Sequence, residues 1–141
     1  MIWIGALLAL STALGLFWTS RTGRARSTPA QTIGLAEIPS GADATLLQFS
    51  TAICSLCPPT RRLLSSIAAD TRGVQHVEIN LTDQPELAAR FGIMQTPTTF
   101  VLDAAGVLRA RIGGAPRPEA VRDVLRLLLN QPAPAPFTPG R

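Results

Sequence analysis

The stretch TLLQFSTAICSLCPPTRRLLSSIAAD, residues 45–70, decides the fold. Its opening TLLQFS is the short apolar run typical of a buried strand, and after Pro59 apolar residues recur at helical spacing. Cys54 and Cys57 lie between these two elements and are the only cysteines of the chain. The stretch therefore predicts a strand, a turn that carries two thiols, and an amphipathic helix.

The rest of the domain continues this alternation of strands and helices. The expected elements are strands at 74–80, 98–103 and 107–112, a helix from Asp83 or Gln84 to Phe91, and a helix over 118–130. A three-residue hairpin loop with Gly106 in the left-handed conformation joins the last two strands. We expect the strands connected by helices to be parallel, the hairpin to be antiparallel, and helices to cover both faces of the sheet.

The two cysteines carry the predicted chemistry. A thiol at the start of a helix faces unpaired backbone N–H groups and the positive end of the helix dipole, and both favour the reactive thiolate. The C-x-x-C spacing lets the second thiol resolve a mixed disulfide that the first has formed. Two alternatives stay open, namely half of a zinc site shared across a dimer and a purely structural disulfide. His76 lies alone in its strand, and neither it nor the acidic residues form a recognisable catalytic group.

A second landmark, Gln95-Thr96-Pro97-Thr98, directly precedes an apolar strand. A proline is tolerated at the first residue of a strand, so a simple strand start is one interpretation. The other is a cis Thr96–Pro97 bond that presents the Thr96 backbone beside the cysteines. An extended substrate segment can then pair with that backbone as an added strand.

On these features, residues 44–130 resemble the thioredoxin family. The matching segments are FSTAICSLC, INLTDQPELAARFGI, TPTTFVLD, the Gly106 hairpin and Gly113-Gly114. The resemblance implies an α/β fold, a thioredoxin-like three-layer sandwich around a mixed four-stranded sheet, with room for a short fifth edge strand. It also implies a thiol–disulfide oxidoreductase in which Cys54 is the nucleophile, Cys57 the resolving thiol and Pro97 the cis-proline.

The resemblance also indicates what the site binds. Thr96, Pro97 and Ile53 are the expected substrate-binding residues, and the expected substrates are proteins or small thiols and disulfides. The Cys54–Cys57 disulfide is the redox group, so we expect no separate cofactor and no metal.

The sequence departs from the family's pattern around the cysteines. Ile53 stands where tryptophan is usual, Ser55-Leu56 replaces Gly-Pro, Gln48 replaces a buried aspartate that manages the proton of the resolving cysteine, and Pro58 replaces a lysine. We expect Pro58 to push Cys57 out of the α conformation, so that the helix begins at Pro58. Arg61 and Arg62 are expected on a solvated helix face, with electrostatic support of Cys54 as the alternative.

Residues 1–18 contain no charge, and as a helix they reach across most of a hydrocarbon core of about 30 Å. Trp3 and Trp18 lie near the two ends, where amphipathic rings favour the headgroup layer. We therefore expect residues 1–19 to form a single uncleaved transmembrane helix, with a cleaved secretory signal as the alternative. Gly5 and Ala9 form a small-xxx-small pair of the kind that binds a membrane-protein partner.

Arg21, Arg24 and Arg26 follow this apolar segment. The positive-inside bias then favours a cell-membrane protein whose domain lies on the cytoplasmic side, with an extracytoplasmic domain as the alternative. The predicted organisation is an anchor at 1–19, a flexible tether at 20–42 whose Ile33–Ile38 segment can add the edge strand, a domain at 43–130, and a disordered Pro-rich tail at 131–141.

Charge and composition argue against nucleic-acid binding. The formal net charge is +4, but residues 43–130 hold nine arginines against eight acidic residues and are nearly neutral. Aromatic residues make up 5% of the chain and tyrosine is absent, so no stacking platform is expected. The predicted function is a membrane-tethered thiol–disulfide oxidoreductase. The alternative is a non-enzymatic thiol adaptor or Cu(I) carrier docked on a membrane partner.

Overall fold

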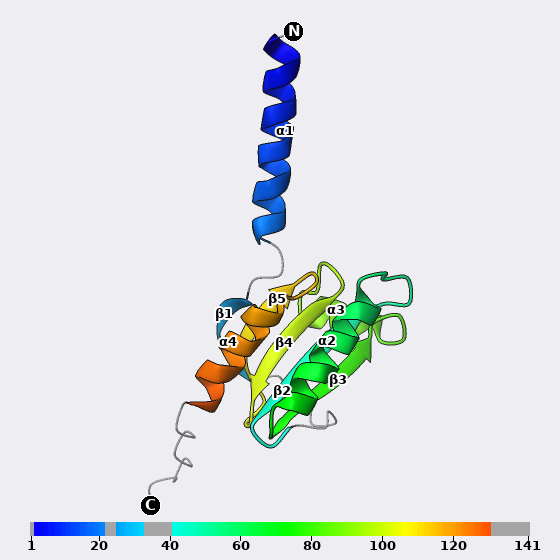
Figure 1. Cartoon of the computed structure of the whole chain (residues 1–141). Coiled ribbons are helices and arrows are strands. Elements are labelled where there is room, and N and C mark those ends of the chain that lie inside the picture. Colours follow the sequence, from blue (N-terminus) through cyan, green and yellow to red (C-terminus); the bar gives the residue numbers. More distant parts are fainter. Residues whose placement is uncertain (1, 22–24, 33–40, 131–141) are drawn as a thin grey trace, which may run out of the picture.

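The computed structural model describes residues 2–21, 25–32 and 41–130 of the chain (Figure 1). Its elements in chain order are α1 (Ile2–Arg21), β1 (Ala25–Thr32), β2 (Ala44–Ser50), α2 (Cys57–Asp70), β3 (Val74–Asn80), α3 (Pro85–Arg90), β4 (Thr98–Asp103), β5 (Val107–Gly113) and α4 (Pro118–Leu129). From β2 onward, every predicted strand and helix is present, with ends that shift by at most a few residues. Gly106 has φ +72°, as the predicted hairpin loop requires.

The strands form one mixed sheet in the order β1-β5-β4-β2-β3. β2 and β3, which α2 connects, are parallel, whereas β4 runs antiparallel to β2 and β5 antiparallel to β4. The prediction of parallel strands is therefore correct for β2 and β3 and wrong for β4. Asn80 at the end of β3 pairs with Ser50, and Thr98 at the start of β4 pairs with the neighbouring Phe49. The segment with the short α3 thus stays at one end of the sheet, and β4 runs back from there.

Helices cover both faces of the sheet, which gives the predicted three layers. Successive strand residues point to opposite faces. On one face Leu46 packs with Leu64 of α2 and Val121 of α4, and Figure 1 shows these two helices lying over that face. On the other face Phe49 packs with Leu87 of α3. The core is thus divided by the sheet, and the end of β2 leads through the turn at residues 51–56 into α2.

Part of the expected tether is a strand instead. Ala25–Thr32 form β1, which pairs antiparallel with β5 at the edge of the sheet. The register shifts between Ser27 and Gln31, and Pro29 lies within this irregularity. Proline is tolerated on edge strands and at bulges, where no ladder hydrogen bond depends on its nitrogen. The predicted fifth strand therefore exists, but at 25–32. The Ile33–Ile38 segment and the predicted tail at 131–141 lie outside the described residues.

The apolar segment at the start of the chain forms α1, and Figure 1 shows this helix extending away from the sheet. The expected transmembrane helix at 1–19 is not supported by the structure. A membrane span must be both long enough and apolar enough along its length, and no helix within the described part of the chain meets both requirements.

Candidate functional site

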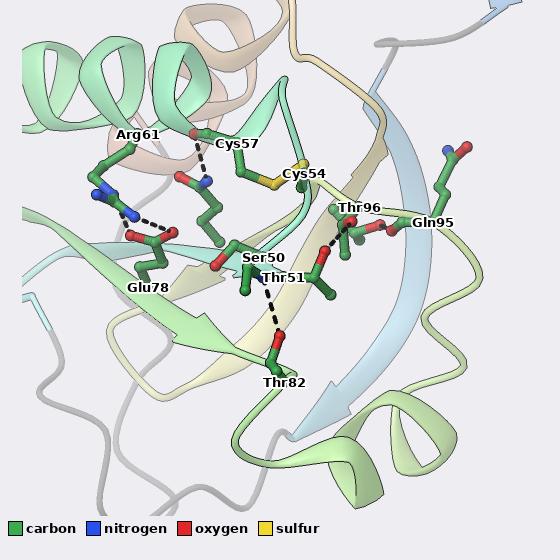
Figure 2. The surroundings of a disulfide bond; sticks show 12 residues. Ser50, Thr51, Cys54, Cys57, Arg61, Glu78, Thr82, Gln95 and Thr96 are labelled. Atoms are coloured by element: carbon green, nitrogen blue, oxygen red, sulfur yellow. Dashed lines mark hydrogen bonds and ion pairs between the residues drawn. A yellow bond between two sulfur atoms is a disulfide. The ribbon is translucent and has the colours of Figure 1, made fainter.

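The candidate site is a disulfide between Cys54 and Cys57 in the turn that joins β2 to α2 (Figure 2). The Cα atoms of the two cysteines are 5.4 Å apart. The backbone N–H of Cys54 donates to the carbonyl of Thr51 at 3.2 Å, and that of Cys57 to the carbonyl of Cys54 at 3.3 Å. Cys54 is half-buried, whereas Cys57 is 2% exposed. An attacking thiol must reach its partner, so this asymmetry suits Cys54 to attack and Cys57 to act from within the protein.

The helix that follows begins at Cys57, so the prediction that Pro58 displaces Cys57 from the helix is wrong. Leu56, which precedes the helix, already has helical backbone angles (φ −86°, ψ −12°), and the turn runs into α2 without a break. Pro58 and Pro59 occupy the first turn of α2, where a backbone N–H has no acceptor within the helix. The two prolines therefore cost α2 no internal hydrogen bond.

The second landmark lies beside this turn. The Thr96–Pro97 peptide bond is cis, as predicted. The hydroxyl groups of Thr51 and Thr96 form a hydrogen bond of 3.1 Å, and Figure 2 shows the two side chains pointing toward each other. Residues that are 45 positions apart in the chain are thereby joined at the end of the sheet. The structure thus brings the predicted Thr96–Pro97 segment to the turn that carries the disulfide.

Large apolar side chains are exposed in the turn that carries the disulfide and just before the cis-proline segment. Ile53 is 95% exposed and Leu56 is 51% exposed, and both belong to the turn itself. Met94, which lies two residues before Thr96, is 91% exposed. We call Ile53, Leu56 and Met94 the apolar rim. Sequence reasoning included Ile53 among the substrate-binding residues but did not single out Leu56 or Met94 for this role.

Beneath the disulfide, a buried amide takes the place of an acid. Gln48 of β2 is fully buried, and its Nε2 donates to the carbonyl of Cys57 at 3.1 Å. Its Oε1 lies 3.2 Å from Nε2 of His76, whose Nδ1 lies 2.9 Å from the hydroxyl of Ser65. Because Gln48 Oε1 only accepts, His76 Nε2 is the donor, and Nδ1 accepts from Ser65. Burial lowers the pKa of His76 below its ordinary value.

An ion pair borders the same region. Arg61 of α2 donates to both carboxylate oxygens of Glu78 on β3, with Nη2 2.9 Å from Oε1 and a second, short contact from Nε to Oε2. Burial raises the pKa of Glu78, but the hydrogen bond from Arg61, with further contributions from Ser50 and from nearby charges, outweighs it, and the pKa is lowered overall. Glu78 therefore carries its negative charge at neutral pH.

The disulfide and the ion pair line one cavity of about 270 Å³. Its lining includes Cys54, Cys57, Arg61, Glu78 and Ser50. Figure 2 shows Arg61 and Glu78 to the left of Cys57, on the side away from Cys54. The two cysteines thus share a cavity with one positive and one negative side chain.

The absence of a catalytic group around His76 and the acidic residues stays a prediction, but sequence reasoning did not anticipate the contacts of His76 with Gln48 and of Glu78 with Arg61. The parallel register pairs Leu46 with His76 and Gln48 with Glu78, so alternate residues of β3 face α2 beside Gln48. The alternation of VQHVEIN carried this signal, but the partner strand and its register were needed to read it. Arg61, expected on a solvated face, is exposed at 55% of its side chain and still reaches Glu78.

Within residues 2–21, 25–32 and 41–130, no group of three or more histidine, cysteine, aspartate or glutamate side chains is arranged to hold a metal ion. The candidate site is thus formed by the disulfide, the cis-proline segment, the buried Gln48 and the ion pair.

Curated relatives of the chain are thioredoxins, although no protein-family model matches it. The chain is 29% identical over 69 residues to a thioredoxin of Streptomyces clavuligerus, a match that covers 47% of this chain and 64% of that protein. It is 28% identical over 79 residues to a thioredoxin of Methanocaldococcus jannaschii, which covers 55% of this chain and 87% of that protein. The chain thus spans slightly less than two thirds of the first relative and most of the second.

Solved thioredoxin structures share the architecture. Mitochondrial thioredoxin 3 from Saccharomyces cerevisiae, in its oxidised form, matches with a TM-score of 0.54 and 22% identity over 61% of this chain and 79% of its own. A Schistosoma mansoni thioredoxin matches with a TM-score of 0.54 and 16% identity over 62% of this chain and 81% of its own. The domain therefore has a thioredoxin-like fold. Together with the C-x-x-C disulfide, the thioredoxin relatives support a thiol–disulfide oxidoreductase.

Proposed function

We propose that the protein is a thiol–disulfide oxidoreductase that exchanges disulfides with other molecules through Cys54 and Cys57. The observation that carries this proposal is the pairing of a half-buried and a buried sulfur in one disulfide, at the start of α2 and beside the cis Thr96–Pro97 bond. A structural disulfide that closes so short a loop would restrict little of the unfolded chain. The position of the disulfide is therefore better suited to exchange than to stability.

The reaction follows from the exposure of the two sulfurs. In the reduced protein, the Cys54 thiolate attacks a substrate disulfide, forms a mixed disulfide and releases one substrate thiolate, which takes up a proton. Cys57 then loses its proton and attacks the Cys54 sulfur, which breaks the mixed disulfide and releases the second substrate thiol. The substrate disulfide gains two electrons and the protein dithiol loses them. No separate cofactor takes part, because the two cysteines hold the electrons.

Protein disulfides are the substrate class that we propose. The apolar rim offers exposed side chains in the turn that carries the disulfide and next to the Thr96–Pro97 segment, as contact with a polypeptide requires. Thr96 and Pro97 lie beside Cys54, where an extended segment of the substrate would pair with the backbone, and Ile53 would contact its side chains. Small thiols and disulfides remain substrates in this proposal because Cys54 is partly accessible.

Trapping the mixed disulfide tests the proposal. The Cys57→Ser variant lacks the resolving thiol, so we expect it to accumulate covalent adducts with a protein disulfide such as insulin. These adducts would appear on a non-reducing gel and disappear after treatment with dithiothreitol. The Cys54→Ser variant is the matched control, and we expect it to form few adducts because Cys57 is 2% exposed. Equal adduct formation by the two variants, or none by Cys57→Ser, would contradict the proposed roles.

Attachment to the cell membrane through residues 1–19 is the further part of this proposal. It is supported by the absence of charge in residues 1–18 and by the exposure of large apolar side chains along α1, among them Trp3, Leu7 and Phe17. The three arginines that follow favour a domain on the cytoplasmic side. We expect the expressed full chain to stay in the membrane pellet after an alkaline carbonate wash, and release into the supernatant would contradict attachment. Digestion of the domain by protease added outside intact cells would overturn the orientation.

A further inference from the structure

We propose that the two charges of the Arg61–Glu78 ion pair act in opposite directions on the ionisation of Cys57, with Glu78 as a fixed negative charge that opposes the resolving thiolate and Arg61 as the positive charge that favours it. This inference rests on the proposed function, because it concerns the step in which Cys57 resolves the mixed disulfide. Arg61 and Glu78 are positioning residues in this account, since neither contacts the reacting sulfur atoms in any described interaction.

The fold brings both charges to Cys57 from different elements. Arg61 follows Cys57 by four residues on α2, so the two side chains lie on the same face of the helix. Glu78 pairs in register with Gln48, whose amide donates to the carbonyl of Cys57. Both charged side chains line the cavity that also contains Cys54 and Cys57 (Figure 2). A thiolate formed at Cys57 is therefore exposed to both charges through a partly solvated space.

Glu78 is suited to act as a charge and poorly suited to accept the proton of Cys57. Arg61 binds both of its carboxylate oxygens, and the pKa of Glu78 lies below its ordinary value. A free cysteine has a pKa of about 8.5, so proton transfer to such a carboxylate is strongly uphill. The proton of Cys57 therefore passes to solvent in the cavity, and Glu78 remains ionised throughout.

The other side chains on this face do not change the sign of the effect. Among the described residues, His76 of β3 is the other titratable group that acts on Glu78, and burial favours its neutral form. From β2, Gln48 and Ser50 face the same region and carry no charge. The Cys57 thiolate thus experiences one positive and one negative neighbour, and removal of either shifts its ionisation in a known direction.

The two charges have opposite effects on one chemical step. Cys57 must lose its proton before its sulfur attacks Cys54, forms the Cys54–Cys57 bond and expels the substrate thiolate. Replacement of Glu78 by glutamine leaves Arg61 without its counter-charge, so the Cys57 thiolate becomes more favourable. Replacement of Arg61 by glutamine leaves Glu78 alone and has the reverse effect. A purely structural ion pair would instead respond to both substitutions in the same direction.

Ellman's reagent, a chromophoric aromatic disulfide, separates this step from the attack by Cys54. The reduced full chain should release one equivalent of chromophore when Cys54 attacks and a second when Cys57 resolves the mixed disulfide. A partly screened unit charge several ångströms away changes an ionisation equilibrium by roughly threefold to tenfold. Because nucleophilicity falls as the thiol pKa falls, we expect the second rate near neutral pH to change by roughly twofold to threefold.

The expected results have opposite signs. Glu78→Gln should accelerate the second phase and lower the midpoint of its pH–rate profile, whereas Arg61→Gln should slow it and raise the midpoint. Both differences should shrink at high salt, because the charges act through a solvated cavity. The double variant should lie close to the wild type. Asp123→Asn and Arg126→Gln remove an exposed ion pair on α4 and serve as controls with unchanged rates.

Several outcomes would overturn the inference. A slower second phase in Glu78→Gln would make Glu78 a proton acceptor, and equal rates in all variants would remove both residues from the step. If Glu78→Gln fails to fold, Glu78→Ser provides the second test. Failure of the proposed function is distinguishable, because the wild-type protein would then not accelerate the reduction of insulin by dithiothreitol, whereas failure of this inference alone would leave that activity in place and remove the opposite responses of the second phase to the two substitutions.

Discussion

Replacement of Gln48 by leucine tests the buried polar contact beneath the disulfide. Gln48 is fully buried, with 0% relative accessibility. Its side-chain amide donates to the Cys57 carbonyl at 3.1 Å and accepts from His76 Nε2 at 3.2 Å. A buried polar group that loses its partner costs about 1–3 kcal/mol. The Cys57 carbonyl belongs to the first turn of α2 and His76 is half-buried, so each retains other partners or water. The leucine side chain also adds apolar burial, which offsets part of the loss.

Because of these offsets, we expect Gln48→Leu to lower the free energy of unfolding by about 1 kcal/mol, near the lower end of this range, measured by urea denaturation of the oxidised protein. For a domain of this size, a loss of 1 kcal/mol corresponds to a decrease in Tm of about 4–8 °C. Thr99→Val is the matched control. Thr99 pairs with Gln48 in the sheet and is also fully buried, but its hydroxyl has no hydrogen-bond partner among the described residues.

Thr99→Val removes a buried hydroxyl that makes no described contact, so we expect it to be neutral or stabilising. The reasoning would be refuted if Gln48→Leu were as stable as the wild type. It would also be refuted if Thr99→Val lost as much stability as Gln48→Leu, since burial alone would then account for both.

Three further predictions follow from burial, charge and packing. Burial lowers the pKa of His76 from 6.5, so the stability that the neutral imidazole contributes is present above pH 6.5 and is lost as the pH falls through the folded-state pKa. The free energies of unfolding of the wild type and of His76→Gln, measured in urea as a function of pH, should diverge in this range. Parallel curves would contradict this prediction. The pKa of Glu78 is lowered from 4.5, so its contribution is lost at still lower pH, and Glu78→Gln should flatten the acid limb of the same curve. Leu64 of α2 is 0% exposed, and we expect Leu64→Ala to lower the free energy of unfolding by about 2–5 kcal/mol. The control Leu127→Ala, at a residue that is 68% exposed, should lower it by less than about 0.5 kcal/mol. Similar losses in the two variants would show that the core is placed wrongly.

The fold could be predicted wherever the signals were local. The apolar run at 45–50, the helical spacing after Pro59 and the glycine at 106 are each sufficient to define an element, and the structure has all three. The direction of β4 could not be read in this way. The direction of β4 depends on whether the segment between β3 and β4 crosses the sheet. This segment, which contains α3, stays at the end of the sheet where β3 ends, so β4 runs back from there.

The edge strand β1 was expected at a different place, at Ile33–Ile38, for a related reason. Ala25–Thr32 is polar and contains Pro29, which by composition resembles a linker. Its backbone hydrogen bonds are supplied by the open edge of β5, a partner more than 70 residues away in the sequence. An edge strand that pairs on one side needs little intrinsic strand propensity, so composition alone did not reveal it.

The positions of the cysteine pair and the cis-proline segment were predictable from the sequence, and the side chains around them were not. The spacing of Cys54 and Cys57 and the Thr96–Pro97 segment were identified from the sequence. The group formed by Gln48, His76 and Glu78 depends on the register between β2 and β3, which a single sequence does not specify. The start of α2 at Cys57 depends on the helical conformation that Leu56 already adopts.

Reduction of insulin by dithiothreitol tests the central claim most directly. The precipitation of the insulin B chain reports the rate at which its disulfides are reduced. We expect the full-length protein to accelerate this precipitation at catalytic concentration and the Cys54→Ser variant to leave it at the rate of dithiothreitol alone. Equal rates with the wild-type protein, with Cys54→Ser and without protein would show that the sulfur pair at the start of α2 does not exchange disulfides with a protein.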